Sequence, residues 1–433
     1  MLPALAVALA MLVAWGAMYI EFHQIAAFVV TALVHGGLYL AAVVWILRRP
    51  PQTHDLWLIL GTALVLRGLA MTAPQHLTTD GLRYVWDGRI QWAGFNPYLL
   101  VPADERLAFL RDALIYPGIN QKETAVTIYP PVAEIMFLIG NWISDSLTGP
   151  KVVFAACELL TIVALLLWLR RDKLPLERIL IYAWHPLPIW EFSSQAHIDS
   201  GATALLMLAI AAAAYKRQGL AGALLAAATL TKYFPILMVP ALWRRFGWRL
   251  PVAFVGTAAL LYLPYVVGAG GKVLGFLAKH LDNEGYGAGY GFHIIWVLRD
   301  LNIVDLPVKA YLATSAVMLA ALGLIALLKR APDDINPAHM LAIATAFVWL
   351  TSPHYAWYFA WLVPLLVRQI SPSVLIFTLL AVIMNGPGNA TWATQTFFYS
   401  VLFGGSALMI TAELLWRWHA RPSARRHWHR PQA

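Results

Sequence analysis

Runs of about 20 apolar residues recur along most of this chain, and few folds can accommodate them. One such run is long enough to cross the hydrocarbon core of a bilayer as a helix. Of the 433 residues, 60% are hydrophobic and 12% are charged, whereas a soluble domain has about 45–50% apolar and about 25% charged residues. The chain therefore has too little polar surface for a soluble core of this size. We predict an all-α polytopic membrane protein with about 12–14 transmembrane helices.

The candidate spans are fourteen in number. They cover residues 3–20, 25–47, 55–72, 151–169, 178–194, 200–215, 219–232, 234–245, 249–267, 308–328, 338–352, 355–368, 372–385 and 397–417. The two between 219 and 245 could form one kinked helix, but Lys232 and Pro235 favour a break between them. The first run has no preceding positive segment, so we expect a retained helix rather than a cleaved signal. The single cysteine, Cys157, excludes an internal disulfide and any cysteine-based metal site.

The distribution of Lys and Arg orients these spans. With the N-terminus in the cytoplasm, nineteen of the 31 basic residues fall in short inner loops and in the C-terminal tail, as the positive-inside rule requires. They are Arg48, Arg49, Arg170, Arg171, Lys173, Arg178, Lys216, Arg217, Arg244, Arg245, Arg249, Lys329, Arg330, Arg368, Arg417, Arg421, Arg425, Arg426 and Arg430. The net charge of +9 thus mostly reflects the orientation of the spans in the membrane, and it suits contact with anionic membrane lipids. No nucleic-acid partner is required.

The same orientation places two large loops outside, at about 73–150 and about 268–307. In the first, residues 104–116 and 130–143 are predicted to form helices on the membrane surface, the second with Pro131 in its first turn. The second loop contains the glycine-rich sequence LDNEGYGAGYGFH, which lacks the GK[ST] ending of a phosphate-binding nucleotide loop. ATP binding is therefore not indicated.

Ionisable residues gather at the outer side of the predicted bundle. An ionisable group within a bilayer costs about 2.5–3.5 kcal/mol, so each requires a reason. Four separate segments and the outer end of the third span contribute to this group, whose members are Arg67, Asp80, Arg83, Asp87, Arg89, His197, Asp199, Lys232, His354 and Tyr355. Their convergence at one side of the membrane is the main functional signal in the sequence.

Each of these residues also has a structural interpretation. The aspartates and arginines near residue 80 could form loop ion pairs, and Arg67 could pair with an acid inside the bundle. Asp199 could cap the helix that follows it, Lys232 could extend from a helix end to the interface, and His354 could belong to an interfacial aromatic belt.

The functional interpretation is transfer of a group from a lipid phosphate. A positioned carboxylate acts as a general base, and cations beside it stabilise charge on a leaving oxygen. An activated lipid is the expected donor, because nucleotide-activated donors are normally confined to the cytoplasm.

Several motifs then resemble a known family. The string D-x-x-R-Y-x-W-D-G-R from Asp80 is followed by G-x-N-P-Y, T-I-Y-P-P, HPLPIWEFSSQAHID, LTKYFP and SPHYAWYFAWLVP. Over residues 55–370 this pattern resembles polytopic glycosyltransferases of the GT-C superfamily. The nearest resemblance is to the polyprenyl-phosphate-dependent mannosyltransferases around glycosyltransferase family 87.

This resemblance implies a GT-C-type fold and an inverting transfer of a hexose, mannose above all, to a lipid or glycan acceptor. The active site would face outward from a bacterial cytoplasmic membrane. Asp80 would be the base, and Lys232, Arg67 and Arg83 would hold the lipid phosphate. The resemblance places Asp199 and His197 where some relatives carry a second acid, and His354 near the donor or acceptor. Asp87, Arg89 and Tyr355 complete the expected substrate-binding set.

The resemblance also bears on metal use and on domain organisation. Gly81 follows Asp80 where a second acid would suggest a metal, so we expect no metal and no other cofactor. Two extra helices would occupy residues 1–50, the catalytic module with its outer loop 73–150 would occupy 51–370, and further helices with a basic cytoplasmic tail would occupy 371–433.

Two other functions fit the same residues less well. A transporter or lipid flippase also gathers polar residues, but such sites tend to lie near the midplane between repeats, and no repeat is evident here. A polysaccharide polymerase or ligase that uses a lipid-pyrophosphate donor would need the same types of residue. The sequence leaves this alternative open.

Overall fold

The computed structural model describes residues 1–21, 24–75, 77–244, 247–275, 277–328, 335–385 and 392–420. Helices and connecting loops make up this described part, and it contains no strand. Seven of its helical segments are long and apolar enough to cross a membrane, or eight if one bent pair counts as a span. The predicted all-α polytopic membrane class is therefore confirmed.

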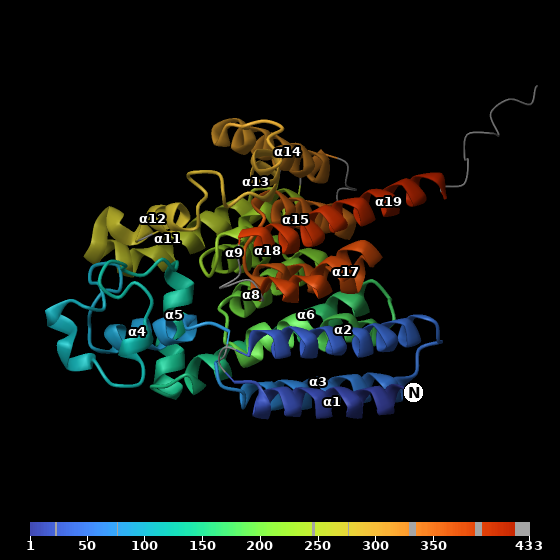
Figure 1. The fold of residues 1–433 in the computed structure, drawn as a ribbon, viewed down its shortest axis with the longest axis horizontal. Coiled ribbons are helices and arrows are strands. Elements are labelled where there is room, and N and C mark those ends of the chain that lie inside the picture. Colours follow the sequence, from blue (N-terminus) through green and yellow to red (C-terminus); the bar gives the residue numbers. More distant parts are fainter. Residues whose placement is uncertain are drawn as a thin grey trace, which may run out of the picture.

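The long segments account for about half of the predicted spans. Five of them are the helices α1 (Leu2–Tyr19), α2 (Ile25–Leu47), α3 (Thr53–Met71), α6 (Thr148–Arg171) and α14 (Val308–Leu328). A sixth begins with α11 (Arg249–Ala269). The seventh, Thr396–His419, joins the end of α18 (Trp392–Tyr399) to α19 (Gly405–His419). The two N-terminal helices pack together, and α1 also packs on α3. Figure 1 shows α1, α2 and α3 side by side along one edge of the molecule.

The other predicted spans are short or broken helices, and proline accounts for several of the breaks. Their elements are α7 (Leu180–Ala183), a π-helix at Pro188–Ser194, α8 (Asp199–Ala214), α9 (Gln218–Thr229), a 3₁₀ helix at Phe234–Met238, α10 (Val239–Leu242), α15 (Pro337–Thr351), a 3₁₀ helix at Ala356–Leu362, α16 (Val363–Arg368), α17 (Pro372–Leu380) and a 3₁₀ helix at Ala381–Asn385. Proline lacks the backbone N–H that a helix interior needs. The predicted break near Lys232 is confirmed, because α9 ends at Thr229 and Pro235 lies in the next helix.

The two predicted outer loops carry their own short helices. These are α4 (Asp80–Trp92), 3₁₀ turns at Glu105–Leu110 and Tyr116–Gly118, α5 (Pro131–Ile143), α12 (Leu277–Asn283) and α13 (His293–Asp300). Figure 1 shows α4, α5 and α12 together at one end of the bundle. A small core built around Trp86 and Leu107 anchors the first loop. The predicted helix at 130–143 is present as α5. The predicted helix at 104–116 is not continuous, because only its 3₁₀ turn at Glu105–Leu110 and Tyr116, the first residue of the next turn, are helical.

Part of the predicted inner charge lies outside the described residues. This applies to Arg245, Lys329 and Arg330, and in the basic tail to Arg421, Arg425, Arg426 and Arg430. The described part still places α4, α5 and α12 at one end of the bundle, and α4 and α12 contribute Asp80 and His280 to the walls of the candidate site.

Candidate active site

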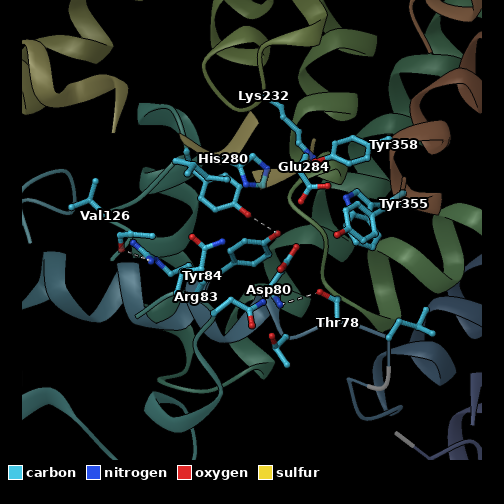
Figure 2. Close-up of a pocket in the computed structure, with 18 residues that line it drawn as sticks. Thr78, Asp80, Arg83, Tyr84, Val126, Lys232, His280, Glu284, Tyr355 and Tyr358 are labelled. Carbon is cyan, nitrogen blue, oxygen red and sulfur yellow. Dashed lines mark hydrogen bonds between the residues drawn. The ribbon is translucent and has the colours of Figure 1, made fainter. Parts of the chain in front are cut away.

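A polar cavity of about 570 Å³ lies between the first outer loop, the start of the second and the bundle. Four predicted site residues line it, namely Asp80, Arg83, Lys232 and Tyr355. Figure 2 shows them projecting from different elements toward a common space. Three of the four predicted segments therefore meet at this cavity, and the segment with His197 and Asp199 does not line it.

Asp80 stands at the first residue of α4, and its carboxylate enters the cavity. Its backbone N–H donates to Thr78 Oγ1 at 3.2 Å. An acidic residue is favoured in the first turn of a helix because the helix dipole is positive there. Among the described residues, the Asp80 carboxylate has no hydrogen-bond or ion-pair partner. Its oxygens are thus available to a bound substrate.

Tyrosine hydroxyls surround this carboxylate. The Tyr129 hydroxyl donates to the Tyr84 hydroxyl at 3.4 Å, and Tyr84 stacks on Phe137 with ring centres 4.5 Å apart. Burial raises the pKa of both tyrosines, and the charge of Asp80 raises it further. Both phenols therefore stay neutral at physiological pH and remain able to donate a hydrogen bond.

Lys232 is the cation on the bundle side of the cavity. Its ammonium lies 2.6 Å from Asp199 Oδ2 and 4.1 Å from the centre of the Tyr358 ring. The ammonium can reach the cavity because α9 ends three residues before Lys232. Asp199 opens α8 but makes no side-chain cap there, so the structure favours an ion pair over the capping interpretation.

The guanidinium of Arg83 is bound by a buried acid. Its Nε donates to Asp87 Oδ1 at 2.8 Å, and its Nη1 donates to the Ala125 carbonyl at 3.0 Å. Asp87 is fully buried and does not line the cavity. The pair fixes the direction in which the guanidinium enters the cavity.

A second, apolar cavity of about 950 Å³ adjoins the first. The predicted residues His354 and Tyr355 are among its lining residues, and Phe234, Phe347 and Trp361 supply part of its apolar surface. Both cavities share the side chains of Ile128, Tyr129, Lys232, His280, Glu284, Tyr355 and Tyr358. Lys232 thus lies where a polar space meets an apolar one, which suits a ligand with a charged group between a polar head and an apolar tail.

Sequence reasoning missed Glu284 and His280, which come from the second outer loop. Glu284 Oε2 lies 3.5 Å from His354 Nδ1. Burial acts to raise the pKa of Glu284, but hydrogen bonding to His354 and the charges of His354 and His280 outweigh it and lower the pKa. The sequence signal is Glu284 in LDNEGYG, where an acid in a glycine-rich loop does not by itself indicate a site.

Three predicted residues lie away from the polar cavity. Arg67 is buried in the bundle, with Nη2 2.7 Å from Glu158 Oε2. Arg89 binds Asp145 at 2.9 Å and also contacts Asp112, which ties the first outer loop together. His197 is buried against Trp357, with ring centres 3.9 Å apart, and lies 3.3 Å from Glu191.

The acidic and histidine side chains of this region are potential metal ligands. Within the described ranges, no group of three or more His, Cys, Asp or Glu side chains is arranged to hold a metal ion. The residues that line the cavity offer a carboxylate that can accept a proton, and cations and phenols that can bind an anion.

Comparison with known proteins gives one match. The sequence model of glycosyltransferase family 87 matches residues 127–353, more than half of the chain. The matched range includes Lys232, Glu284 and most of the apolar cavity, and it begins after Asp80. No curated protein and no solved structure matches the chain.

Proposed function

Since this chain belongs to glycosyltransferase family 87, we propose that it transfers a hexose from a polyprenyl-phosphate donor to an acceptor hydroxyl, with Asp80 as general base. It is a membrane glycosyltransferase by family and by its apolar helices. Mannose is the hexose we propose, and a lipid or glycan is the acceptor. The reaction would take place at the non-cytoplasmic face of a bacterial cytoplasmic membrane.

The observation that carries this proposal is the Asp80 carboxylate, which has no partner among the described residues and lies in a polar cavity that adjoins an apolar one. A sugar and an acceptor hydroxyl fit the polar space, and an isoprenoid chain fits the apolar space. The donor phosphate would then lie near Lys232 in the shared wall. This division matches the three chemical parts of a polyprenyl-phosphate sugar.

The proposed reaction is a single displacement. Asp80 takes the proton from the acceptor hydroxyl while that oxygen attacks the anomeric carbon. The bond from this carbon to the phosphate oxygen breaks, and polyprenyl phosphate leaves with the bonding electrons. Attack from the face opposite the phosphate inverts the anomeric configuration.

Lys232 would stabilise the phosphate as it departs. Its charge is already compensated by Asp199 at 2.6 Å, so the ammonium would be fixed in position before the donor binds. Pre-organised charge of this kind lowers the barrier because it need not reorient during reaction. Arg83, whose guanidinium is positioned by Asp87, would supply a second positive charge from the other side of the cavity.

The test is sugar transfer by membranes that contain the full-length protein. Labelled polyprenyl-phosphate mannose and a mixed lipid extract would be supplied to wild type and Asp80→Asn at matched expression. We expect a new labelled product in wild type and a loss of at least about a hundredfold in the variant, the lower range for a missing general base.

The matched control is Asp145→Asn, which changes an acid of the same outer loop that is half-exposed and does not line the cavity. Its transfer rate should stay within about threefold of wild type, because Asp145 is itself exposed to solvent and Arg89 keeps its second acidic partner, Asp112. Unchanged transfer by Asp80→Asn would remove Asp80 from the mechanism. Because Gly81 follows Asp80, we also propose that transfer continues when divalent cations are chelated.

A further inference from the structure

A second carboxylate faces the polar cavity from the wall opposite Asp80. Figure 2 shows Glu284 and Asp80 entering the same space from different sides. Glu284 follows α12 in the second outer loop, so the two acids come from loops that are far apart in the chain. An inverting transfer needs only one base, and the second acid therefore requires a separate explanation.

Glu284 is anchored in place. Its Oε2 lies 3.5 Å from His354 Nδ1, and the other ring nitrogen of His354 lies 3.2 Å from the Gly291 carbonyl. The ring of Tyr286 stacks on His354 with ring centres 5.8 Å apart. These contacts attach the second outer loop to the turn that precedes Tyr355. They leave Glu284 in the lining of the cavity, within reach of a bound molecule.

The position of Glu284 along the two cavities indicates which part of a substrate it meets. Glu284 lines both cavities, as Lys232 does, whereas Asp80 lines only the polar one. If the donor phosphate lies near Lys232, the sugar attached to it lies between Lys232 and Asp80. Glu284 is then beside the donor sugar rather than beside the acceptor.

We propose that Glu284 binds hydroxyl groups of the donor sugar and thereby determines which hexose is transferred. This inference rests on the function proposed above. A carboxylate has about four acceptor positions, so one that contacts a histidine can still accept from one or two sugar hydroxyls. Hydrogen bonds to a charged partner also discriminate strongly against a substrate that lacks the matching hydroxyl.

Two other roles for Glu284 predict different results. If Glu284 were the base, its removal would lower kcat for every donor equally. If it only anchored the loop, its removal would again act equally on every donor, and a variant of His354 would have the same effect. Only direct contact between Glu284 and a sugar hydroxyl predicts that the effect of removing Glu284 depends on which hydroxyl groups the donor carries.

The experiment uses membranes that contain the full-length protein and polyprenyl-phosphate mannose, with its 2-, 3-, 4- and 6-deoxy forms. In wild type, we expect at least one deoxy donor to have a kcat/KM about 10- to 100-fold below that of mannose, as for a lost hydrogen bond to a charged group. Glu284→Gln should lower kcat/KM for mannose and lose most of the discrimination against that same deoxy donor.

Two variants provide the controls. His354→Gln removes the anchor but keeps the carboxylate, so it should retain the wild-type pattern of discrimination. Glu123→Gln changes an exposed acid of the first outer loop that does not line the cavity, and it should behave as wild type. Equal losses for all donors in Glu284→Gln, or no loss at all, would overturn the inference while leaving the proposed function intact. Polyprenyl-phosphate glucose and galactose are supplied in parallel, and failure of wild type to transfer any of the three hexoses would instead overturn the proposed function.

Discussion

Below the polar cavity, two buried carboxyl groups share one hydrogen-bonded network. Thr127 is hydrogen-bonded to Glu134 at 2.6 Å, and Gln91 donates to the other Glu134 oxygen at 3.0 Å. Asp87 has an arginine partner in Arg83, but Glu134 has no ion-pair partner among the described residues. Burial raises the pKa of both carboxyl groups. Arg83 opposes this rise at Asp87 through its charge and a hydrogen bond, whereas the charge of Asp87 raises the pKa of Glu134 further. We therefore assign the negative charge of this network to Asp87.

This assignment predicts opposite outcomes for two similar substitutions. Glu134→Gln replaces a neutral acid by a neutral amide, so we expect the melting temperature in detergent at pH 7 to be unchanged or higher. Asp87→Asn leaves Arg83 without its partner, and breaking such a buried pair costs about 3–5 kcal/mol. We expect a lower melting temperature and slower sugar transfer for this variant.

The same network predicts a pH dependence. A raised folded-state pKa means that folding holds the Glu134 proton, so stability falls as pH rises above the ordinary carboxyl value of 4.5. Glu134→Gln removes this effect. The melting temperature of this variant should therefore rise relative to that of wild type as the pH increases from 5 to 8. A constant difference between the two melting temperatures across this range would contradict the assignment.

At the scale of single residues, part of the candidate site could be predicted from the sequence. Asp80, Lys232 and Arg83 could be predicted because a charged residue near a span is unusual enough to need an explanation. Glu284 could not, because an acid in a polar loop is common and only the fold brings it to Asp80. Arg67, Arg89 and His197 are unusual for the same reason as Asp80. However, Arg67 and Arg89 pair with acids away from the cavity, and His197 is buried behind the lining residue Trp357.

At the scale of the elements, the contact between α4 and α5 positions the candidate base. A Cβ at Gly88 would overlap the Phe137 carbonyl oxygen, which belongs to the backbone of α5 and cannot move aside easily. The close approach allows α4, which carries Asp80 and Arg83 on its first turns, to lie directly against α5. The glycine therefore fixes the distance between the acid and the rest of the outer loop.

We expect Gly88→Ala to separate the two helices. Overpacking of this kind costs about 1–3 kcal/mol, and the shift of α4 should lower sugar transfer even in protein that remains folded. Melting temperature and transfer rate measured on the same preparation would test this. Gly68→Ala is the control, because a Cβ there meets nothing within 4 Å, and it should leave both quantities near wild type.

The length of the apolar runs in the sequence predicted the long helices better than the short ones. The spans near α1, α2, α6 and α14 agree with the prediction because each is an uninterrupted apolar run of 18 residues or more. The run at 178–194 contains Arg178, His185 and Glu191, and it is divided between α7 and the π-helix at Pro188–Ser194. The bend of 117° between that π-helix and α8 falls where two separate spans are predicted. Hydropathy measures composition, whereas the break inside 178–194 depends on prolines and on packing against the rest of the bundle.

At the scale of the whole molecule, the grouping of the outer-loop elements at one end makes a prediction about membrane orientation. The positive-inside rule places that end outside the cytoplasm. The only native cysteine, Cys157, is buried in α6, so an introduced thiol can be labelled against a low background. Glu123 is exposed in the first outer loop and Arg48 is exposed after α2.

We expect Glu123→Cys to react with a membrane-impermeant maleimide in intact cells. Arg48→Cys should react only after the membrane is permeabilised. The extent of labelling, measured by the mass shift of the purified protein, distinguishes the two orientations. Labelling of Arg48→Cys but not of Glu123→Cys in intact cells would place the candidate site on the cytoplasmic side.

The buried pair of Arg67 and Glu158 has a consequence for how the protein is made. Arg67 lies in α3, and its partner belongs to α6, three helices later in the chain. When α3 emerges from the ribosome, its arginine opposes insertion by about 2.5–3.5 kcal/mol, and the acid that would compensate it has not yet been synthesised. Biogenesis of the first helices should therefore depend on the translation of α6, so that the ion pair joins early and late parts of the nascent chain.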